Sequence, residues 1–330
     1  MDVISQAIFG SSLSQSFAND KVQQFSAFLI GALAGMAPDL DVLIRSSDDP
    51  LLFLEFHRQF THSLIFIPFG ALVCTFLFYP FIKKKLRFLQ VYLFSFLGIA
   101  THGLLDACTS YGTQLFWPFS NERVSWSIVS IVDPFFTIPI IIFIWIAIHR
   151  NNRSYARVAF IYAIVFLSLG LLQKQRAENA VNILAQQRGH KTERVLVKPG
   201  FGNRHVWKLI YEYNGRYYVD AVSLLWDKKI ISGTSIKKLN LKRDFEWLDA
   251  NSVQAKDVER FRWFSNDFLA VDMNNENIIT DVRYSLLPNE IRLMWGVELS
   301  EGNLEGAHVK FITDVKLNSE DKNKFMNMLF

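Results

Sequence analysis

Long apolar segments separated by short polar ones make up the first half of the chain. Five of these segments are long enough to cross the roughly 30 Å hydrocarbon core of a membrane as α-helices. They cover residues 25–44, 63–82, 88–108, 128–148 and 156–172. A sixth segment, residues 3–17, is interrupted by Gly10 and several serines. It either spans the membrane or forms a helix that packs inside the bundle or lies at the interface.

The second half of the chain has a different pattern. From Gln173 the apolar runs shorten, and apolar and polar residues alternate as they do in half-buried strands. Residues 206–213 and 216–226 flank Asn214-Gly215 and predict a β-hairpin. The same reasoning predicts a hairpin from 268–273 and 278–284, strands at 291–299 and 309–315, and helices at 173–189 and 251–264.

These patterns predict a mainly α protein in two parts. Residues 1–174 form a polytopic helical membrane bundle, and residues 175–330 form a small soluble α+β domain with its own core. Composition agrees, because half of the 330 residues are hydrophobic and 30 are Phe, which is too apolar for an ordinary soluble protein. The two cysteines, Cys74 and Cys108, fall in or at the end of apolar segments and give no disulfide framework.

The chain carries a formal net charge of +4. In a soluble protein this would suggest an anionic partner, but here basic residues fill two short loops, residues 83–87 and 150–157. The positive-inside rule places both loops in the cytoplasm. We therefore expect the lipid bilayer, and no nucleic acid, as the partner. The same rule predicts that the α+β domain is extracytoplasmic.

Seven residues of metal-ligand type fall at the extracytoplasmic ends of the apolar segments. They are Asp39, Asp41, His57, His62, His102, Asp106 and Asp133. Polar residues scattered at random would have fallen at both ends. An ionisable group at membrane depth costs about 2.5 to 3.5 kcal/mol on insertion scales, so the cluster needs a compensating charge. One or more zinc-like divalent cations would provide it.

The spacing of the histidines bears on this hypothesis. His102 and Asp106 are one helical turn apart, so both side chains can reach one cation. The alternative is a His–Asp hydrogen bond that holds the helix to a neighbour. His57 and His62 are five residues apart, which is not one helical face, so the chain must bend between them if both bind metal.

Asp39 and Asp41 place two carboxylates at the end of a predicted helix, where the macrodipole disfavours negative charge. With a cation present, they bridge metals or divide into a ligand and a general base. Otherwise they are acids that face water at the membrane surface. Asp133 precedes Pro134 and suits the N-cap of a helix as well as it suits a metal site.

Arg58 lies between the two histidines of the segment His57 to His62. A guanidinium there could clamp a phosphate or carboxylate with two parallel hydrogen bonds. Its alternative role is an ion pair with Glu55. The candidate catalytic residues are therefore Asp39, Asp41 and Arg58.

The motifs around these residues resemble those of the YdjM type of membrane-bound, predicted metal-dependent hydrolases, a bacterial inner-membrane family. The matching segments are MDVISQAIFG at the start, PDLD at 38–41, HRQFTHS at 57–63, THGLLDACTSYGTQLFWPFS at 101–120 and VDP at 132–134. The tail, with WFSNDFLAV at 263–271, resembles the C-terminal extension of one branch of the family. Many members carry a His near the sixth residue, whereas this chain has Gln6.

This resemblance implies a multi-pass protein of the bacterial inner membrane with a metal-dependent hydrolase activity. More distantly, a helix that presents His and Asp four residues apart is similar to the zinc-dependent phospholipase C and P1 nuclease group. That similarity implies a phosphoester substrate and allows more than one metal ion.

The leading hypothesis is a metal-dependent hydrolase that acts on a phosphoester or lipid-like substrate at the extracytoplasmic membrane face. A divalent-cation or proton transporter is an alternative, because acids and histidines in membrane segments also mark ion pathways. The middle portions of the apolar segments, such as residues 66–78 and 138–147, contain almost no polar residues, which favours a one-sided site. A non-catalytic membrane scaffold with a structural metal is the other alternative.

Overall fold

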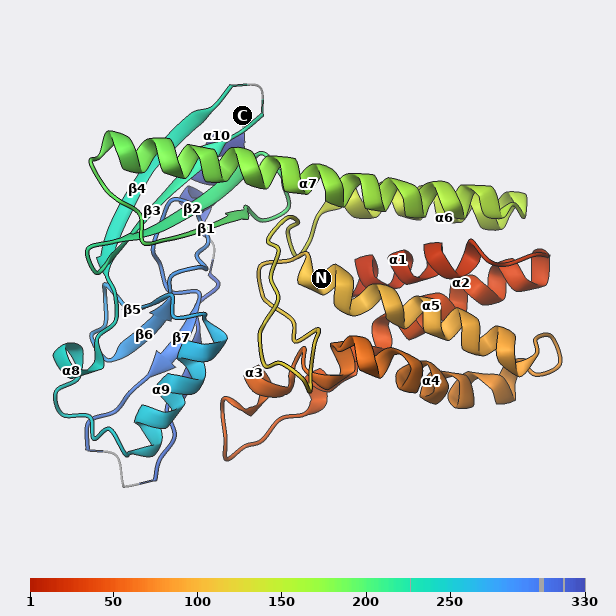
Figure 1. Cartoon of the computed structure of the whole chain (residues 1–330), viewed down its shortest axis with the longest axis horizontal. Coiled ribbons are helices and arrows are strands. Elements are labelled where there is room, and N and C mark those ends of the chain that lie inside the picture. The colour runs from red at the N-terminus through yellow and green to blue at the C-terminus, as the bar shows by residue number, and fades with distance from the viewer. Residues whose placement is uncertain (226, 303–305, 317, 330) are drawn as a thin grey trace. The chain divides into compact units, whose positions relative to one another are not determined.

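The computed structural model describes residues 1–225, 227–302, 306–316 and 318–329. The chain forms two compact units (Figure 1). The N-terminal unit contains Met1–Leu43, Phe56–Leu172 and Phe201–Asn203. The C-terminal unit contains Ile44–Glu55, Gln173–Gly200 and Arg204–Phe330, so a short segment from the first half of the chain belongs to it.

The N-terminal unit is a helical bundle. Its longer helices are α1 (Val3–Gln15), α2 (Lys21–Met36), α4 (Ile67–Ile82), α5 (Phe88–Ala107), α6 (Pro134–Arg150) and the first part of α7 (Arg153–Gln187). The helix α2 continues as the 3-10 helix η1 (Ala37–Leu43). Three short helices connect it to α4, namely α3 (Leu52–Phe56), η2 (Phe60–His62) and η3 (Leu64–Phe66).

Four helical stretches in the described residues are long and apolar enough to cross a membrane. They are Lys21–Leu43, Leu64–Ile82, Phe88–Ala107 and Arg153–Gln187. Five spans were expected, and the one that is not among these four, residues 128–148, is replaced by the 17-residue helix α6, which begins only at Pro134. The helix starts late because Asp133 caps it and Pro134 occupies its first turn.

The helix α1 packs inside the bundle, which was one of the outcomes expected for residues 3–17. Small residues allow its close approach to α2 and α5, as is common between membrane helices. A Cβ added at Gly10 of α1 would lie 2.6 Å from the carbonyl oxygen of Gly31 in α2, and a Cβ added at Gly98 of α5 would lie 2.7 Å from the same oxygen. The serine hydroxyls of α1 are hydrogen-bonded within the bundle; Ser14, for example, donates to the carbonyl of Phe94 at 2.9 Å.

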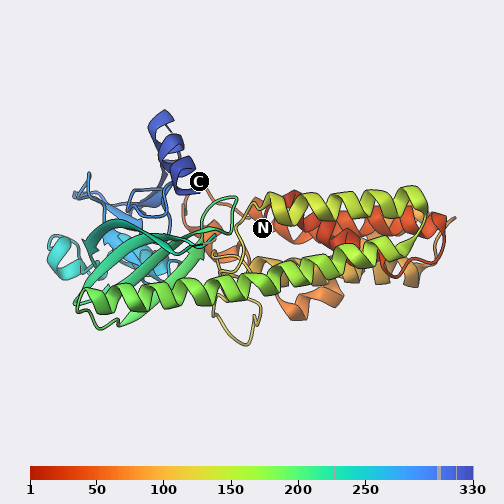
Figure 2. The same cartoon turned by 90° about the horizontal axis from the view of Figure 1, so that it is seen from above.

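Both basic loops lie at the same end of the bundle. The α4–α5 and α6–α7 connections are at the end opposite the N-terminus, as Figures 1 and 2 show. The turn between α1 and α2 is at this end too, because Arg153 donates to Asn19 at 2.6 Å and Arg157 donates to the carbonyl of Ser16 at 3.3 Å.

The C-terminal unit contains two four-stranded antiparallel sheets. The first has the order β1 (Arg194–Pro199), β2 (Val206–Tyr213), β3 (Arg216–Ser223) and β4 (Lys229–Lys237). The second has the order β5 (Leu269–Val271), β6 (Ile278–Asp281), β7 (Trp295–Glu298) and β8 (Lys310–Thr313). Among the described residues, its helices are α8 (Leu241–Asp244), α9 (Val253–Phe264) and α10 (Ser319–Leu329), together with most of α3 and the second half of α7.

Both predicted hairpins are confirmed. The first turns at Asn214 and Gly215, whose φ angles of 50° and 66° are those of a type I′ turn. Its second strand ends at Ser223; the predicted end, Trp226, lies outside the described residues. The strands expected at 291–299 and 309–315 and the helix at 251–264 are present in shorter form, whereas β1, β4 and α10 were not predicted.

The helix expected for residues 173–189 is present as far as Gln187, but it is not a separate element, because these residues continue α7 without a break. The chain therefore passes from one unit to the other inside a single 35-residue helix. Its polar second half packs its small apolar residues, among them Ala177 and Val181, against Trp207 and Tyr211 of β2. Residues of both sheets, including Tyr217 and Phe268, form a further core cluster.

The glycine contact between α5 and α2 gives a stability prediction. Gly98→Ala should lower the free energy of unfolding by about 1 to 3 kcal/mol, because the new methyl group meets a backbone oxygen that cannot move aside. Thermal unfolding in detergent measures the effect. Gly70→Ala is the control, because its methyl group would meet the ring of Phe66, a side chain that can turn away. Equal thermal midpoints for both variants would contradict the prediction.

Candidate metal centre

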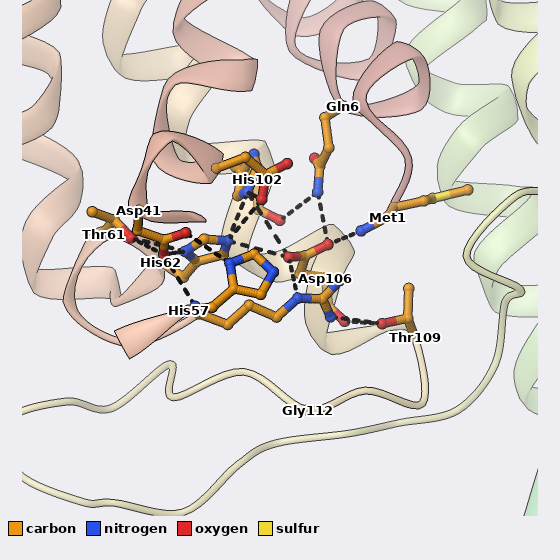
Figure 3. Close-up of polar contacts among 12 residues, drawn as sticks. Met1, Gln6, Asp41, His57, Thr61, His62, His102, Asp106, Thr109 and Gly112 are labelled. Carbon is orange, nitrogen blue, oxygen red and sulfur yellow. Dashed lines mark hydrogen bonds and ion pairs between the residues drawn. The ribbon is translucent and has the colours of Figure 1, made fainter. Parts of the chain in front are cut away.

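Six of the seven expected ligand residues meet at one end of the helical bundle (Figure 3). They come from segments that are far apart in the sequence. Asp39 and Asp41 lie in η1, His57 follows α3, and His62 ends η2. His102 and Asp106 occupy the last turns of α5.

The first group of ligand atoms comes from Asp39, His62, His102 and Asp106, and all of these atoms lie within 4.8 Å of one another. The Oδ1 atom of Asp39 is 3.4 Å from Nε2 of His62 and 3.4 Å from Nε2 of His102. The Oδ2 atom of Asp106 is 3.3 Å and 3.9 Å from the same two nitrogens. The two Nε2 atoms are 2.9 Å apart.

These distances are close to those of a tetrahedral site. With metal–ligand bonds of about 2.0 to 2.1 Å, neighbouring ligand atoms in a tetrahedron lie about 3.3 Å apart. Two carboxylate oxygens and two imidazole nitrogens are also a donor set that zinc accepts. The four residues could therefore hold a divalent cation with little rearrangement.

The Nδ1 atoms of His62 and His102, which are not among the four ligand atoms, have hydrogen-bond partners of their own. Nδ1 of His102 donates to the carbonyl oxygen of Gly35 at 2.5 Å, which leaves Nε2 of the neutral ring as a lone-pair donor. Nδ1 of His62 is 3.2 Å from Oδ2 of Asp41, which also accepts from the Thr61 hydroxyl at 2.7 Å. Partners of this kind on the outer nitrogen are typical of histidines that bind metal.

The electrostatics at this point favour a positive charge. Burial lowers the pKa of the His62 imidazole, but hydrogen bonds with Asp106 and the two other carboxylates outweigh burial and raise that pKa to about 10. A divalent cation would compete with the proton on His62.

A second group of ligand atoms comes from Asp39, Asp41 and His57. It shares Asp39 with the first group. Oδ1 of Asp41 is 2.7 Å from Nδ1 of His57. The chain bends between His57 and His62, as their spacing requires, and the two rings meet edge to face with centroids 5.8 Å apart.

Arg58 is buried beside the cluster. Its Nε is 3.1 Å from Oδ2 of Asp106, its Nη1 donates to the Thr109 hydroxyl at 3.1 Å, and its guanidinium lies 4.7 Å from the centre of the Tyr111 ring. The ion pair with Glu55, the alternative drawn from the sequence, is wrong, because Glu55 pairs with Arg260 instead.

Asp106 is held from the other side by residues of the N-terminal segment. Gln6 donates to its Oδ1 at 2.9 Å, and the amino group of Met1 contacts the same oxygen (Figure 3). Gln6 thus contacts a candidate ligand directly. Sequence reasoning did not assign a site role to Gln6, Thr61 or Thr109.

Asp133 belongs to neither group. It caps α6, where its carboxylate accepts from the backbone N–H of Phe135 at 3.0 Å and of Phe136 at 3.4 Å. This is the capping role that the sequence analysis kept as an alternative.

The approach of η2 to α5 depends on Gly103. A Cβ at this position would lie 2.2 Å from the carbonyl oxygen of His62. Only glycine therefore allows His62 to come within reach of His102 and Asp106. The cluster therefore requires glycine at position 103.

Two curated proteins are similar to part of the chain. The chain is 27% identical to the uncharacterized protein YfhP of Bacillus subtilis (strain 168) over 202 residues, which are 58% of this chain and 58% of YfhP. It is 33% identical to the inner membrane protein YbcI of Escherichia coli (strain K12) over 109 residues, which are 32% of this chain and 61% of YbcI. The chain thus spans about three fifths of the length of these curated relatives.

No solved structure matches the chain, and its similarity to the phospholipase C and P1 nuclease group remains an expectation. The model of the YdjM inner membrane protein family matches residues 1–177, which include every residue of the two ligand groups. The family and YbcI support a location in the bacterial inner membrane. The chain belongs to the YdjM inner membrane protein family.

Proposed function

We propose that the protein is a membrane-bound metal-dependent hydrolase that acts on a phosphoester or lipid-like substrate at the extracytoplasmic face. The observation that carries the proposal is the convergence of four ligand atoms, from Asp39, His62, His102 and Asp106, at nearly tetrahedral spacing. When bound, a zinc-like cation supplies a Lewis acid that polarises an acyl or phosphoryl oxygen and lowers the pKa of water.

The residues around this point have different roles in the proposal. Asp39 is the ligand with an exposed side, since 22% of its side chain is accessible, whereas the side chains of His62 and Asp106 are fully buried. Substrate and water would therefore arrive beside Asp39. Asp41 orients His62, and Arg58 adds a fixed positive charge that favours an anionic substrate.

A cation or proton transporter is the second candidate, and α1 is the feature that favours it. Buried polar residues, including Ser11, Ser12 and Gln15, continue along α1 away from the cluster. The hydroxyls of Ser11 and Ser12 donate to carbonyls of their own helix, those of Ala7 and Phe9. Such bonds are typical of helix packing in membranes, so the hydrolase remains the first choice.

The proposed topology places the basic loops in the cytoplasm and the metal centre with the C-terminal domain outside. The two basic loops lie at the end of the bundle opposite the N-terminus, and Met1 contacts Asp106 of the cluster. The positive-inside rule then orients the bundle. A phosphatase reporter fused after residue 330 should be active, and the same reporter in the loop at residues 83–87 should be inactive. The reverse pattern would contradict the proposed orientation.

Substitutions of the ligands test the proposed activity. His102→Ala and Asp39→Asn should each lose bound zinc and turnover, because they remove ligand atoms. Asp41→Asn should keep the four ligand atoms of the first group but weaken zinc binding there by about 10- to 100-fold, because it loosens the orientation of His62. Zinc content and hydrolysis of a chromogenic phosphodiester and of phospholipid vesicles, with and without chelator, measure these effects.

His149→Ala is the matched control for these variants, because His149 is exposed at the far end of α6. It should leave zinc content and turnover unchanged. Full zinc occupancy and turnover in His102→Ala would contradict the proposal. Bound zinc in the unaltered protein without hydrolysis of any substrate would instead support a structural metal.

A further inference from the structure

The side of the cluster formed by Asp39, Asp41 and His57 offers a further set of ligand atoms. We propose that this set holds a second divalent cation, with Asp39 bridging the two ions. The inference deepens the proposed function and rests on the metal centre proposed there. It also assigns His57 to a different ion from His62, although both lie in one short segment.

The two oxygens of Asp41 have different surroundings. Oδ2 is 3.2 Å from Nδ1 of His62 and accepts from the Thr61 hydroxyl at 2.7 Å. Oδ1 points to Nδ1 of His57, 2.7 Å away. A cation bound by Oδ1 and His57 would therefore leave the contacts of Oδ2 with His62 intact.

The backbone at Arg58 holds His57 in place. Arg58 has a φ of 68°, a conformation that costs energy for a residue with a side chain and that persists where the surroundings enforce it. Here its N–H donates to Oδ2 of Asp41 at 3.1 Å, and its carbonyl accepts from the N–H of Gln114 at 2.9 Å. The bend of the backbone at Arg58 thus holds the His57 ring next to Asp41 without a bound ion.

The second ion would have an open position. The side chain of His57 is 20% exposed and that of Asp39 is 22% exposed, whereas the side chains of His62 and His102 are fully buried. Two divalent cations in one centre, about 3.5 to 4 Å apart, repel each other, and a bridging carboxylate and an anionic ligand offset this repulsion. The proposed ligand class is therefore a phosphate group, which has oxygens for both ions.

Metal content separates this inference from the proposed function. Purified full-length protein without a histidine tag should bind about two equivalents of zinc, as expected for a two-metal centre, and bind the second more tightly with inorganic phosphate. His57→Ala, or His57→Gln if the first variant is unstable, should bind about one equivalent with no effect of phosphate. His149→Ala controls for zinc on exposed histidines and should match the unaltered protein.

Other zinc contents would reject the second ion, the role of His57 as a ligand, or the proposed function itself. One equivalent of zinc in both the unaltered protein and His57→Ala rejects the second ion and leaves the proposed function standing. Two equivalents in His57→Ala reject His57 as a ligand. No bound zinc in the unaltered protein rejects the proposed function together with this inference.

A separate observation concerns the segment Ile44–Glu55, which lies between Asp41 and His57 in the sequence and belongs to the C-terminal unit. Arg260 of α9 binds it with a bidentate ion pair to Asp49, with distances of 3.0 and 2.8 Å, and with a further hydrogen bond to Glu55. The Phe53 ring packs edge to face on Phe311 with centroids 5.1 Å apart.

Arg260 is itself held by a buried carboxylate. Its Nη1 donates to Oδ1 of Asp257 at 2.9 Å, and the other oxygen of Asp257 accepts from His308 at 2.8 Å and from the N–H of Val309 at 3.1 Å. Paired, planar hydrogen bonds of this kind fix position as well as charge. Arg260 therefore forms a clamp, in which it binds Asp49 and Glu55 of the segment and is itself held by the buried Asp257 of the C-terminal domain.

We infer that Arg260 is a positioning residue for the metal centre. The segment that it binds is the covalent link between two candidate ligands, Asp41 and His57, so its anchoring limits the conformations that both can adopt. Ordering the ligands before the ion arrives reduces the conformational entropy lost on binding. Arg260 would thus tune the affinity of the metal centre through the segment that it binds.

Arg260→Ala tests this role. We expect faster proteolytic cleavage within residues 44–55 and zinc binding weakened by about 10- to 100-fold, the range typical of partners that orient metal ligands. Arg262→Ala is the control, because Arg262 lies on the same helix but pairs with Glu259 and Asp267. Arg260→Lys should recover part of the affinity, since it keeps the charge without the bidentate geometry.

Faster cleavage with unchanged zinc affinity would show that Arg260 anchors the segment without positioning the ligands. Unchanged cleavage and affinity would reject the clamp altogether. Equal losses of affinity in Arg260→Ala and Arg262→Ala would point to general destabilisation of α9 and would overturn the inference as well.

Discussion

The structure around the end of α5 depends on one electrostatic constraint. Three carboxylates, from Asp39, Asp41 and Asp106, lie close together in an apolar bundle, and their charge must be balanced locally. Arg58 balances part of it, and the position between His62 and His102 attracts a proton or a cation. Glycines bring α2, α5 and η2 close enough for the charged groups to meet.

The sequence predicted this cluster better than it predicted the contacts that support it. His102 and Asp106 follow from helical spacing, and the location of the other ligands at the same membrane face follows from the topology of the spans. Gln6 and Thr61 could not be found this way, because their roles depend on which helices pack together. Arg58 illustrates the limit, since its nearest acidic residue in the sequence, Glu55, binds a guanidinium from the distant helix α9.

The errors in the predicted fold have similar causes. Residues 173–189 looked like a separate element because their composition is polar, yet the helix continues where its surroundings change from apolar to polar. The strand β4 was missed because it lies at the edge of its sheet and shows no regular alternation of buried and exposed residues. The hairpin at Asn214-Gly215 was found because two residues with positive φ determine the turn locally.

The continuous helix α7 has a consequence for how the extension relates to the rest of the family. At 1.5 Å per residue its 35 residues measure about 52 Å, whereas about 30 Å suffice to cross the hydrocarbon core. The family match ends at residue 177, within this helix, so the two parts of the chain are joined by regular secondary structure and not by a linker. Lengthening or shortening α7 by a single residue would turn the face of its first half, which buries Ala159 and Ala163, by about 100° relative to the face that packs Ala177 and Val181. Insertions and deletions at the junction should therefore be tolerated only in steps close to whole helical turns, a constraint that flexible tethers between domains do not impose.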